Sequence, residues 1–297
     1  MEKKDNNLIG KLVFRLVKKH IAGSTSSAVL NVIRDLNNKG MHTTVTLLND
    51  HVDDQTKARY NANAYIQFIK QLSRLQLDSD VSIRPSQIGG NVDTDLLEWN
   101  MNEIVNAANQ GNQRLWIEEE SSGISNVVQL YRKFKPKCSL LGVEVRPDYS
   151  DVEGEEVSKL FSGKDMVKLR CHIDEGKPHP KGVDKLRLYR NYIDVLMAKK
   201  VHLTVLEHDQ KLISRLVSLS KDYKKNLIIE IPLGYNGKPS KSAKGRLNMS
   251  VYVPYGKDWI PYFINRLAEG RVRNIAVTLL NGQTNVDTNA KKKQGKG

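Results

Sequence analysis

The sequence has few cysteines and no long hydrophobic run. Its two cysteines, Cys138 and Cys171, lack the spacing of a metal-binding motif. A chain of 297 residues with so few cysteines has no disulfide framework, which is typical of a reducing compartment. No apolar stretch approaches the roughly 20 residues that cross a bilayer, and the charged segment Met1–Asn7 is unlike a secretory signal. We therefore expect a cytoplasmic protein.

Nucleic-acid motifs are also missing, although the net charge is +14. Part of that charge lies in the polar, glycine-containing tail Lys291–Gly297, whose composition predicts disorder. The aromatic residues are not interleaved with a basic stripe. We therefore expect a solvated basic surface and no nucleic-acid partner.

Short β-rich runs alternate with helical periodicity along most of the chain. The expected strands are Thr43–Asn49, Val81–Ile88, Arg114–Glu120, Leu140–Arg146, Met166–Ile173, Val201–His208, Leu227–Leu233 and Met249–Tyr255. The expected helices between them include Lys57–Leu75, Leu96–Ala108, Asp184–Ala198 and Lys211–Leu219. This alternation predicts right-handed βαβ units and a parallel sheet. An open doubly wound sheet is the main rival, and the absence of a GxGxxG motif after any strand disfavours it.

The predicted fold is therefore an α/β protein, a (β/α)8 TIM-barrel-like domain with an extra N-terminal helix. That helix, Ser24–Asn37, would be capped by Ser24 or Ser26 and would cover the barrel or its rim. Residues 1–20 would form an N-terminal segment, residues 21–283 a single barrel domain and residues 284–297 a disordered basic tail. Asn236–Leu247, rich in glycine, lysine, proline and serine, is either a loop or a degraded helix.

Charged residues gather at the strand ends, where the active site of a TIM barrel lies. They are Arg84, Glu118, Glu119, Glu120, Glu144, Arg146, Lys168, Arg170, His172, Glu207, His208, Asp209 and Glu230. Any one of them could simply face water at a strand end. Together, both signs of charge at one mouth suit an anionic or zwitterionic ligand. Glu118, Glu120, Glu144 and His172 have metal-ligand chemistry, but no HxxxH or DxD spacing supports a metal site.

The segment Met249–Ala268 has the form strand, turn, helix. Val251 and Val253 alternate with polar residues, and Asp258 can cap the helix that follows. The unit places Tyr252, Trp259, Tyr262 and Arg266 around one strand end. This grouping suits a flat aromatic cofactor or a small carboxylate.

This segment resembles the last strand and helix of the FAD-dependent proline dehydrogenases of the monofunctional bacterial type. Their pattern is Tyr-x-Pro-x-Gly, then Tyr-x-x-Arg-Arg-Leu-x-Glu, and the matching residues are Tyr252, Pro254, Gly256, Tyr262, Arg266, Leu267 and Glu269. Val81–Gly89 resembles the family's Val-Ser-Val-Lys-x-Thr-Gln-Leu-Gly, and Leu206–Asp209 its Ala-Thr-His-Asp. The resemblance extends from about Ile21 to Ile275, so the chain is similar to a divergent member of that family.

The resemblance implies oxidation of proline, or of a related secondary amine or imino acid, by hydride transfer to FAD. It assigns catalytic roles to Arg84 and Tyr252, and substrate binding to Tyr262, Asn265 and Arg266. It assigns cofactor binding to Arg146, Lys168, His208, Glu230 and Glu269. A membrane quinone would accept the electrons, with the protein at the inner face of the membrane.

The departures from the family pattern fall on the chemistry. Arg84 replaces an active-site lysine, Lys168 replaces a flavin-contacting arginine, and Arg146 replaces a flavin-contacting glutamine. The catalytic aspartate of the third strand falls at Ile117 or Glu118, and Asn265 replaces the first of two carboxylate-binding arginines. These changes favour a second reading, in which a catalytically degenerate and flavin-free barrel acts as a binding or regulatory protein.

Overall fold

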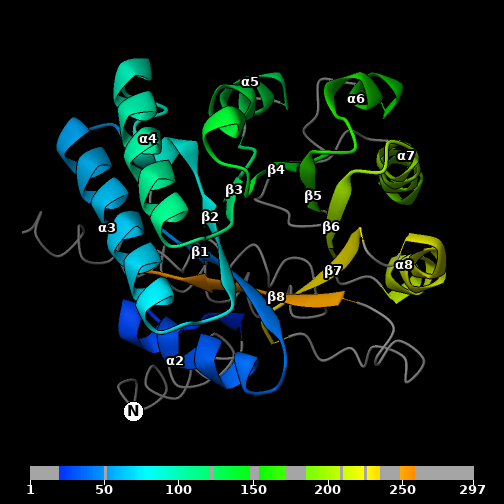
Figure 1. Cartoon of the computed structure of the whole chain (residues 1–297), viewed down its shortest axis with the longest axis horizontal. Helices are drawn as coiled ribbons and strands as arrows, with labels where there is room; N and C mark the ends of the chain where they lie inside the picture. The colour runs from blue at the N-terminus through cyan, green and yellow to red at the C-terminus, as the bar shows by residue number, and fades with distance from the viewer. Residues whose placement is uncertain are drawn as a thin grey trace, which may run out of the picture.

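The eight strands close into one parallel barrel in the order in which they occur along the chain (Figure 1). The computed structural model describes residues 20–49, 52–120, 124–147, 154–170, 185–207, 210–223, 226–234 and 248–257. The strands are β1 His42–Leu47, β2 Ser79–Ile83, β3 Leu115–Ile117, β4 Leu141–Val145, β5 Met166–Arg170, β6 His202–Leu206, β7 Leu227–Pro232 and β8 Asn248–Tyr255. β1 pairs with both β2 and β8, which completes the closure. The predicted barrel is confirmed.

Helices surround the barrel on its outside (Figure 1). They are α2 Ser26–Asn37, α3 Gln55–Arg74, α4 Thr94–Gln110, α5 Ile124–Phe134, α6 Gly154–Leu160, α7 Lys185–Ala198 and α8 Gln210–Tyr223. Two short 3-10 helices, η1 Pro85–Ile88 and η2 Lys135–Lys137, complete the described elements. None of the helices in this described part combines the length and hydropathy that a membrane span requires.

Local side-chain caps start the first three helices. Asp54 accepts a hydrogen bond from the Lys57 backbone nitrogen at 2.9 Å, and Asp93 accepts one from Leu96 at 2.8 Å. Thr25, and neither Ser24 nor Ser26, caps α2 by accepting from Ala28 at 3.3 Å. Each cap satisfies a backbone donor that the first helical turn leaves without a partner.

The second strand is shorter than the sequence predicts. It ends at Ile83, and the segment expected to continue it forms η1 instead. Pro85 explains the change, because its ring forces Arg84 into an extended conformation and it has no N–H to donate to a sheet. Helices α5 and α6 were not among the helices predicted from the sequence. The expected ends of the fifth strand, at 171–173, and of the sixth strand, at 208, lie outside the described residues.

The extra N-terminal helix α2 packs on the outside of the barrel against β1 and β8 (Figure 1). Its apolar face buries Val29 and Ile33 completely. The chain leading into it is tied to the end of β8, since Ala22 donates to the Pro254 carbonyl at 2.9 Å. The helix therefore covers the seam where the first and last strands meet.

A tryptophan fills the part of the barrel interior nearer the amino-terminal ends of the strands. Trp116 on β3 points inward, and its indole nitrogen donates to Asp80 on β2 at 2.8 Å. Its neighbour on β4 is Gly142, where an added Cβ would lie 2.5 Å from the indole ring. Only glycine leaves room for the ring at this position, so Gly142 and Trp116 together form the floor beneath the polar residues described next.

Candidate functional site

A fully buried ion pair lies above the tryptophan floor. The Lys168 ammonium on β5 donates to both carboxylate oxygens of Glu230 on β7, at 3.0 and 2.9 Å, and to the Thr44 hydroxyl at 3.2 Å. Thr44 in turn donates to Glu230 at 2.5 Å. Both charged side chains are 0% exposed, and the ammonium sits 4.7 Å from the Trp116 ring centre. All three ammonium protons therefore have partners within the barrel or its floor.

Glu118 is the centre of a second polar layer, the upper layer, which lies nearer the carboxyl ends of the strands. Its carboxylate accepts from Thr46 at 2.8 Å and from Arg84 Nε at 2.9 Å. It also lies 3.3 Å from the Arg170 guanidinium and 3.5 Å from the Tyr252 hydroxyl. Burial alone would raise the pKa of Glu118, but the charges of Arg170 and Arg84 outweigh burial and lower it. Glu118 is therefore a carboxylate at neutral pH.

Arg170 connects three strands within this layer. Its Nε lies 2.6 Å from Glu144 on β4, and its NH2 donates to Glu144 and to the Tyr252 hydroxyl, each at 3.0 Å. The guanidinium also lies 4.8 Å from the centre of the Tyr252 ring. Burial, aided by the charge of Glu118, raises the pKa of Glu144 to about 7, although Arg170 opposes the shift. The layer therefore holds a carboxyl group that can carry a proton near neutral pH.

Further polar contacts lie where the strands end. Glu120 accepts hydrogen bonds from the backbone and the hydroxyl of Ser86 in η1. Glu119 accepts from the backbone nitrogen of Arg146 at the end of β4. These contacts tie the chain after β3 to the neighbouring strand ends on both sides, which fixes the shape of the barrel mouth.

The structure brings some of the expected site residues together and separates others. Arg84 and Tyr252 meet around Glu118 in the upper layer, whereas Lys168 and Glu230 form the enclosed pair below it. Arg146 lies at the end of β4 and is 3% exposed. The other expected site residues, which are His172, His208, Tyr262, Asn265, Arg266 and Glu269, lie outside the described residues.

The described carboxylates have partners other than a metal. Glu118 faces two arginines, and Glu120 faces Ser86. Within the described ranges no group of three or more histidine, cysteine, aspartate or glutamate side chains could hold a metal ion. The metal arrangement considered from the sequence also needed His172, which is not among these ranges.

Sequence reasoning gives the residues that organise the upper layer only partial roles. The resemblance offers Glu118 for the catalytic aspartate, and Glu118 and Glu144 were considered as metal ligands. Strand parity places Arg170 on the same face as Lys168, without a role of its own. No sequence signal indicates that Glu118 would bridge Arg84 and Arg170 from different strands.

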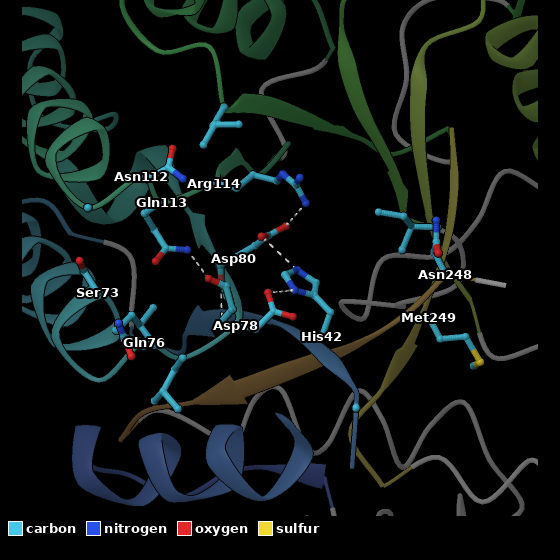
Figure 2. A pocket seen from close by; sticks show the side chains of 17 residues that line it. His42, Ser73, Gln76, Asp78, Asp80, Asn112, Gln113, Arg114, Asn248 and Met249 are labelled. Carbon is cyan, nitrogen blue, oxygen red and sulfur yellow. Dashed lines mark hydrogen bonds and ion pairs between the residues drawn. The ribbon is translucent and has the colours of Figure 1, made fainter. Parts of the chain in front are cut away.

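A cavity lies at the opposite end of the barrel from Glu118, where the strands begin. Figure 2 shows the side chains that line it. It has a volume of about 710 Å³ and is formed by the starts of strands and the loops before them, including His42, Asp78, Arg114 and Asn248. His42 lies between two carboxylates, 2.6 Å from Asp78 and 3.0 Å from Asp80. Burial alone would lower the pKa of His42, but the hydrogen bonds and charges of Asp80 and Asp78 outweigh burial and raise it to about 9.

The raised pKa of His42 predicts that the chain loses stability at alkaline pH. A histidine whose folded pKa exceeds its unfolded value stabilises the fold fully below pH 6.5, and this contribution disappears as the pH rises through about 9. The difference corresponds to about 3 kcal/mol. Urea unfolding of the parent and of His42→Gln at pH 6 and pH 9.5 measures it. Between pH 6 and pH 9.5, the free energy of unfolding should fall by about this amount more in the parent than in the variant. Equal falls in the two proteins would contradict the raised pKa of His42.

Comparisons with known proteins point to one family. The chain is 26% identical over 265 residues to proline dehydrogenase 2 of Bacillus subtilis strain 168, covering 87% of each chain. It is 25% identical over 272 residues to proline dehydrogenase 1 of Bacillus subtilis subsp. natto, covering 88% of this chain and 89% of that one. No protein-family model matches the sequence.

A solved structure shows the same fold. Proline utilization A (PutA) from Bdellovibrio bacteriovorus, inactivated by N-propargylglycine, matches with a TM-score of 0.75 at 14% sequence identity. The match covers 89% of this chain but only 33% of that chain, so the barrel corresponds to about a third of the larger protein. At this identity the structural match concerns the fold alone, and the similarity in sequence is to the proline dehydrogenases.

Proposed function

We propose that the chain is a divergent member of the proline dehydrogenase family and that it oxidises proline or a related secondary amine at the carboxyl end of its barrel. The observation that carries this proposal is the layer in which Glu118 holds Arg84 and Arg170 beside Tyr252. Two guanidinium groups there face Glu118 and a second carboxyl, Glu144, whose pKa of about 7 leaves it partly protonated. The excess of positive charge favours a substrate carboxylate.

Arg84 is the proposed contact for that carboxylate. Its side chain is 17% exposed, whereas that of Arg170 is 1% exposed, so Arg84 is the more accessible of the two cations. Glu118 holds Arg84 through Nε, which fixes the direction of the guanidinium group. By the resemblance, Arg266 would bind the same carboxylate, and Tyr252 and Tyr262 would flank the substrate ring. Tyr252, however, is 0% exposed and accepts a hydrogen bond from Arg170, so it does not fit this role as it stands.

The family resemblance implies FAD, which would accept a hydride from the substrate. Two of the residues expected to contact it do not fit that role. Lys168 and Glu230 are both 0% exposed and bond to each other, so neither presents an atom to a ligand at the mouth. Of the remaining expected contacts Arg146 is described, and His208 and Glu269 are outside the described ranges.

The closed Lys168–Glu230 pair favours a second candidate function. Lys168 and Glu230 bond to each other and present no atom to a cofactor, while the hydrogen-bonded upper layer keeps its positive charge. Such a barrel could bind a small carboxylate without oxidising it. This reading is the flavin-free binding or regulatory protein. It differs from the enzyme reading in the cofactor and the reaction, while the ligand class is the same.

The visible spectrum of the purified protein distinguishes the two functions. We expect flavin absorption bands that bleach when proline is added without oxygen. A protein that stays colourless after incubation with FAD, yet binds proline by calorimetry, would favour the binding function. A membrane quinone as electron acceptor, and association with the inner face of a membrane, belong to the enzyme proposal and are tested by quinone-dependent turnover of the same sample.

Asn265 predicts that proline is a poor substrate. Losing one charge-assisted contact to a carboxylate costs about 1.5–3 kcal/mol, which is roughly one to two decades in binding. Asn265→Arg should therefore lower the KM for proline, or speed flavin bleaching, by about tenfold or more. The matched control is Asn265→Gln, which adds length without charge and should leave the rate unchanged. Rapid bleaching of the parent at sub-millimolar proline would contradict the prediction.

A further inference from the structure

The cavity at the amino-terminal end of the barrel is separate from the proposed catalytic mouth. Its walls come from the starts of β1, β2 and β8 and from the loops that precede β2 and β3 (Figure 2). The buried Trp116 and the Lys168–Glu230 pair lie between this cavity and the upper layer of polar residues. A ligand in the cavity would therefore not contact Arg84 or Tyr252.

Four charged side chains form a row of alternating sign along this cavity (Figure 2). The order is Asp78, His42, Asp80 and Arg114, with contacts of 2.6, 3.0 and 3.4 Å between successive members. Trp116 anchors the inner part of the row from inside the barrel by donating to Asp80. The two central members are thus held on both sides and keep their positions.

The two ends of the row are less completely paired than its centre. The Asp78 side chain is 70% exposed, and His42 contacts one of its carboxylate oxygens. The Arg114 side chain is 32% exposed and reaches Asp80 at 3.4 Å, the longest contact of the row. Its Nε is buried and has no hydrogen-bond partner among the described residues. The exposed fractions of the two side chains mean that one end presents a carboxylate and the other a partly exposed guanidinium group.

We propose that this cavity binds a small zwitterion that carries an ammonium group at one end and a carboxylate at the other. The ammonium group pairs with Asp78 and the carboxylate with Arg114, so that the ligand continues the alternation of charge at both ends of the row. The amide side chains of Gln76, Asn112 and Asn248 also line the cavity and suit a polar ligand.

The row also determines which ligands fit poorly. A simple cation would gain Asp78 but leave Arg114 unsatisfied, and a simple anion would do the reverse. An α-amino acid has its two charges only two bonds apart, whereas His42 and Asp80 separate Asp78 from Arg114. The ligand must therefore separate its charges by several bonds, as an ω-amino acid does.

Isothermal titration calorimetry of the full chain with 6-aminohexanoic acid tests the proposal at low ionic strength, where exposed charges are least screened. We expect one binding site per chain, unaffected by saturating proline. Hexanoic acid, hexylamine and alanine should each bind at least about fivefold more weakly. No detectable binding up to about 10 mM, competition by proline, or equal binding of any of the three analogues would overturn the proposal.

Two variants test whether the charged row forms the binding site. Asp78→Asn and Arg114→Gln each remove one terminal charge and should each weaken binding by about fivefold or more. Matched controls are Asp35→Asn on α2 and Arg74→Gln at the end of α3, which change the same charges at exposed positions that do not line the cavity. Unchanged affinity in the first pair, or an equal loss in the control pair, would show that the row is not the site. Circular dichroism confirms that each variant is folded.

Discussion

Replacing Lys168 with methionine is expected to destabilise the chain by about 3–5 kcal/mol. The substitution leaves the Glu230 carboxylate buried, with the hydroxyls of Thr44 and Ser250 as its remaining partners in the barrel. Glu230 is 0% exposed, so water cannot replace the lost ammonium without opening the barrel. Urea unfolding followed by circular dichroism measures the loss, which is a large share of the stability of a typical domain.

A double variant and a surface pair provide the controls for this measurement. Lys168→Met combined with Glu230→Leu removes both charges and should recover much of the lost stability, because no unpaired charge is left. Arg215→Met breaks the exposed pair between Arg215 and Asp194, 3.0 Å apart, and should change stability by less than about 1 kcal/mol. A loss of similar size in the Arg215 and Lys168 variants would show that the buried pair has no special role.

Under the proposed function, replacing Arg170 with lysine is expected to lower the rate of proline oxidation by about two orders of magnitude. Lysine keeps the charge but lacks the planar fork with which Arg170 reaches Glu144, Glu118 and Tyr252 together. Tyr252 and Glu118 would then lose their common partner, and the groups at the mouth would shift. The measurement is the rate constant for flavin bleaching by proline under anaerobic conditions, with near-ultraviolet circular dichroism to confirm folding.

Arg84→Lys is the matched control for that experiment. Arg84 reaches Glu118 through Nε and is more exposed than Arg170, so a lysine there can adjust its position. It also restores the residue that the family pattern has at this position. We expect its rate to stay within about threefold of the parent, or to rise, and equal losses in both variants would contradict a distinct positioning role for Arg170.

Local patterns in the sequence predict the elements of the fold well. The helices α3, α4, α7 and α8 follow from apolar residues at helical spacing, and their observed ends differ from the predicted ones by a few residues. The eight strands follow from short β-rich runs between helices, and their number and alternation favour a closed barrel. Departures include α5 and α6, which were not predicted, the short third strand, and the end of the second strand, where Pro85 carries a local signal that overrides the β-rich run.

The sequence by itself determined the resemblance to the proline dehydrogenases, the barrel and which charges share a strand face. Only the tertiary structure decided which of those charges meet. Lys168 and Glu230 are 62 residues apart, and they pair because β5 and β7 flank β6 in the sheet and both direct these side chains into the barrel interior. The row from Asp78 to Arg114 has no sequence signal, because its members lie at strand starts and in loops without periodicity. Strand parity fixes a direction for each side chain, whereas the register between distant strands fixes its partner.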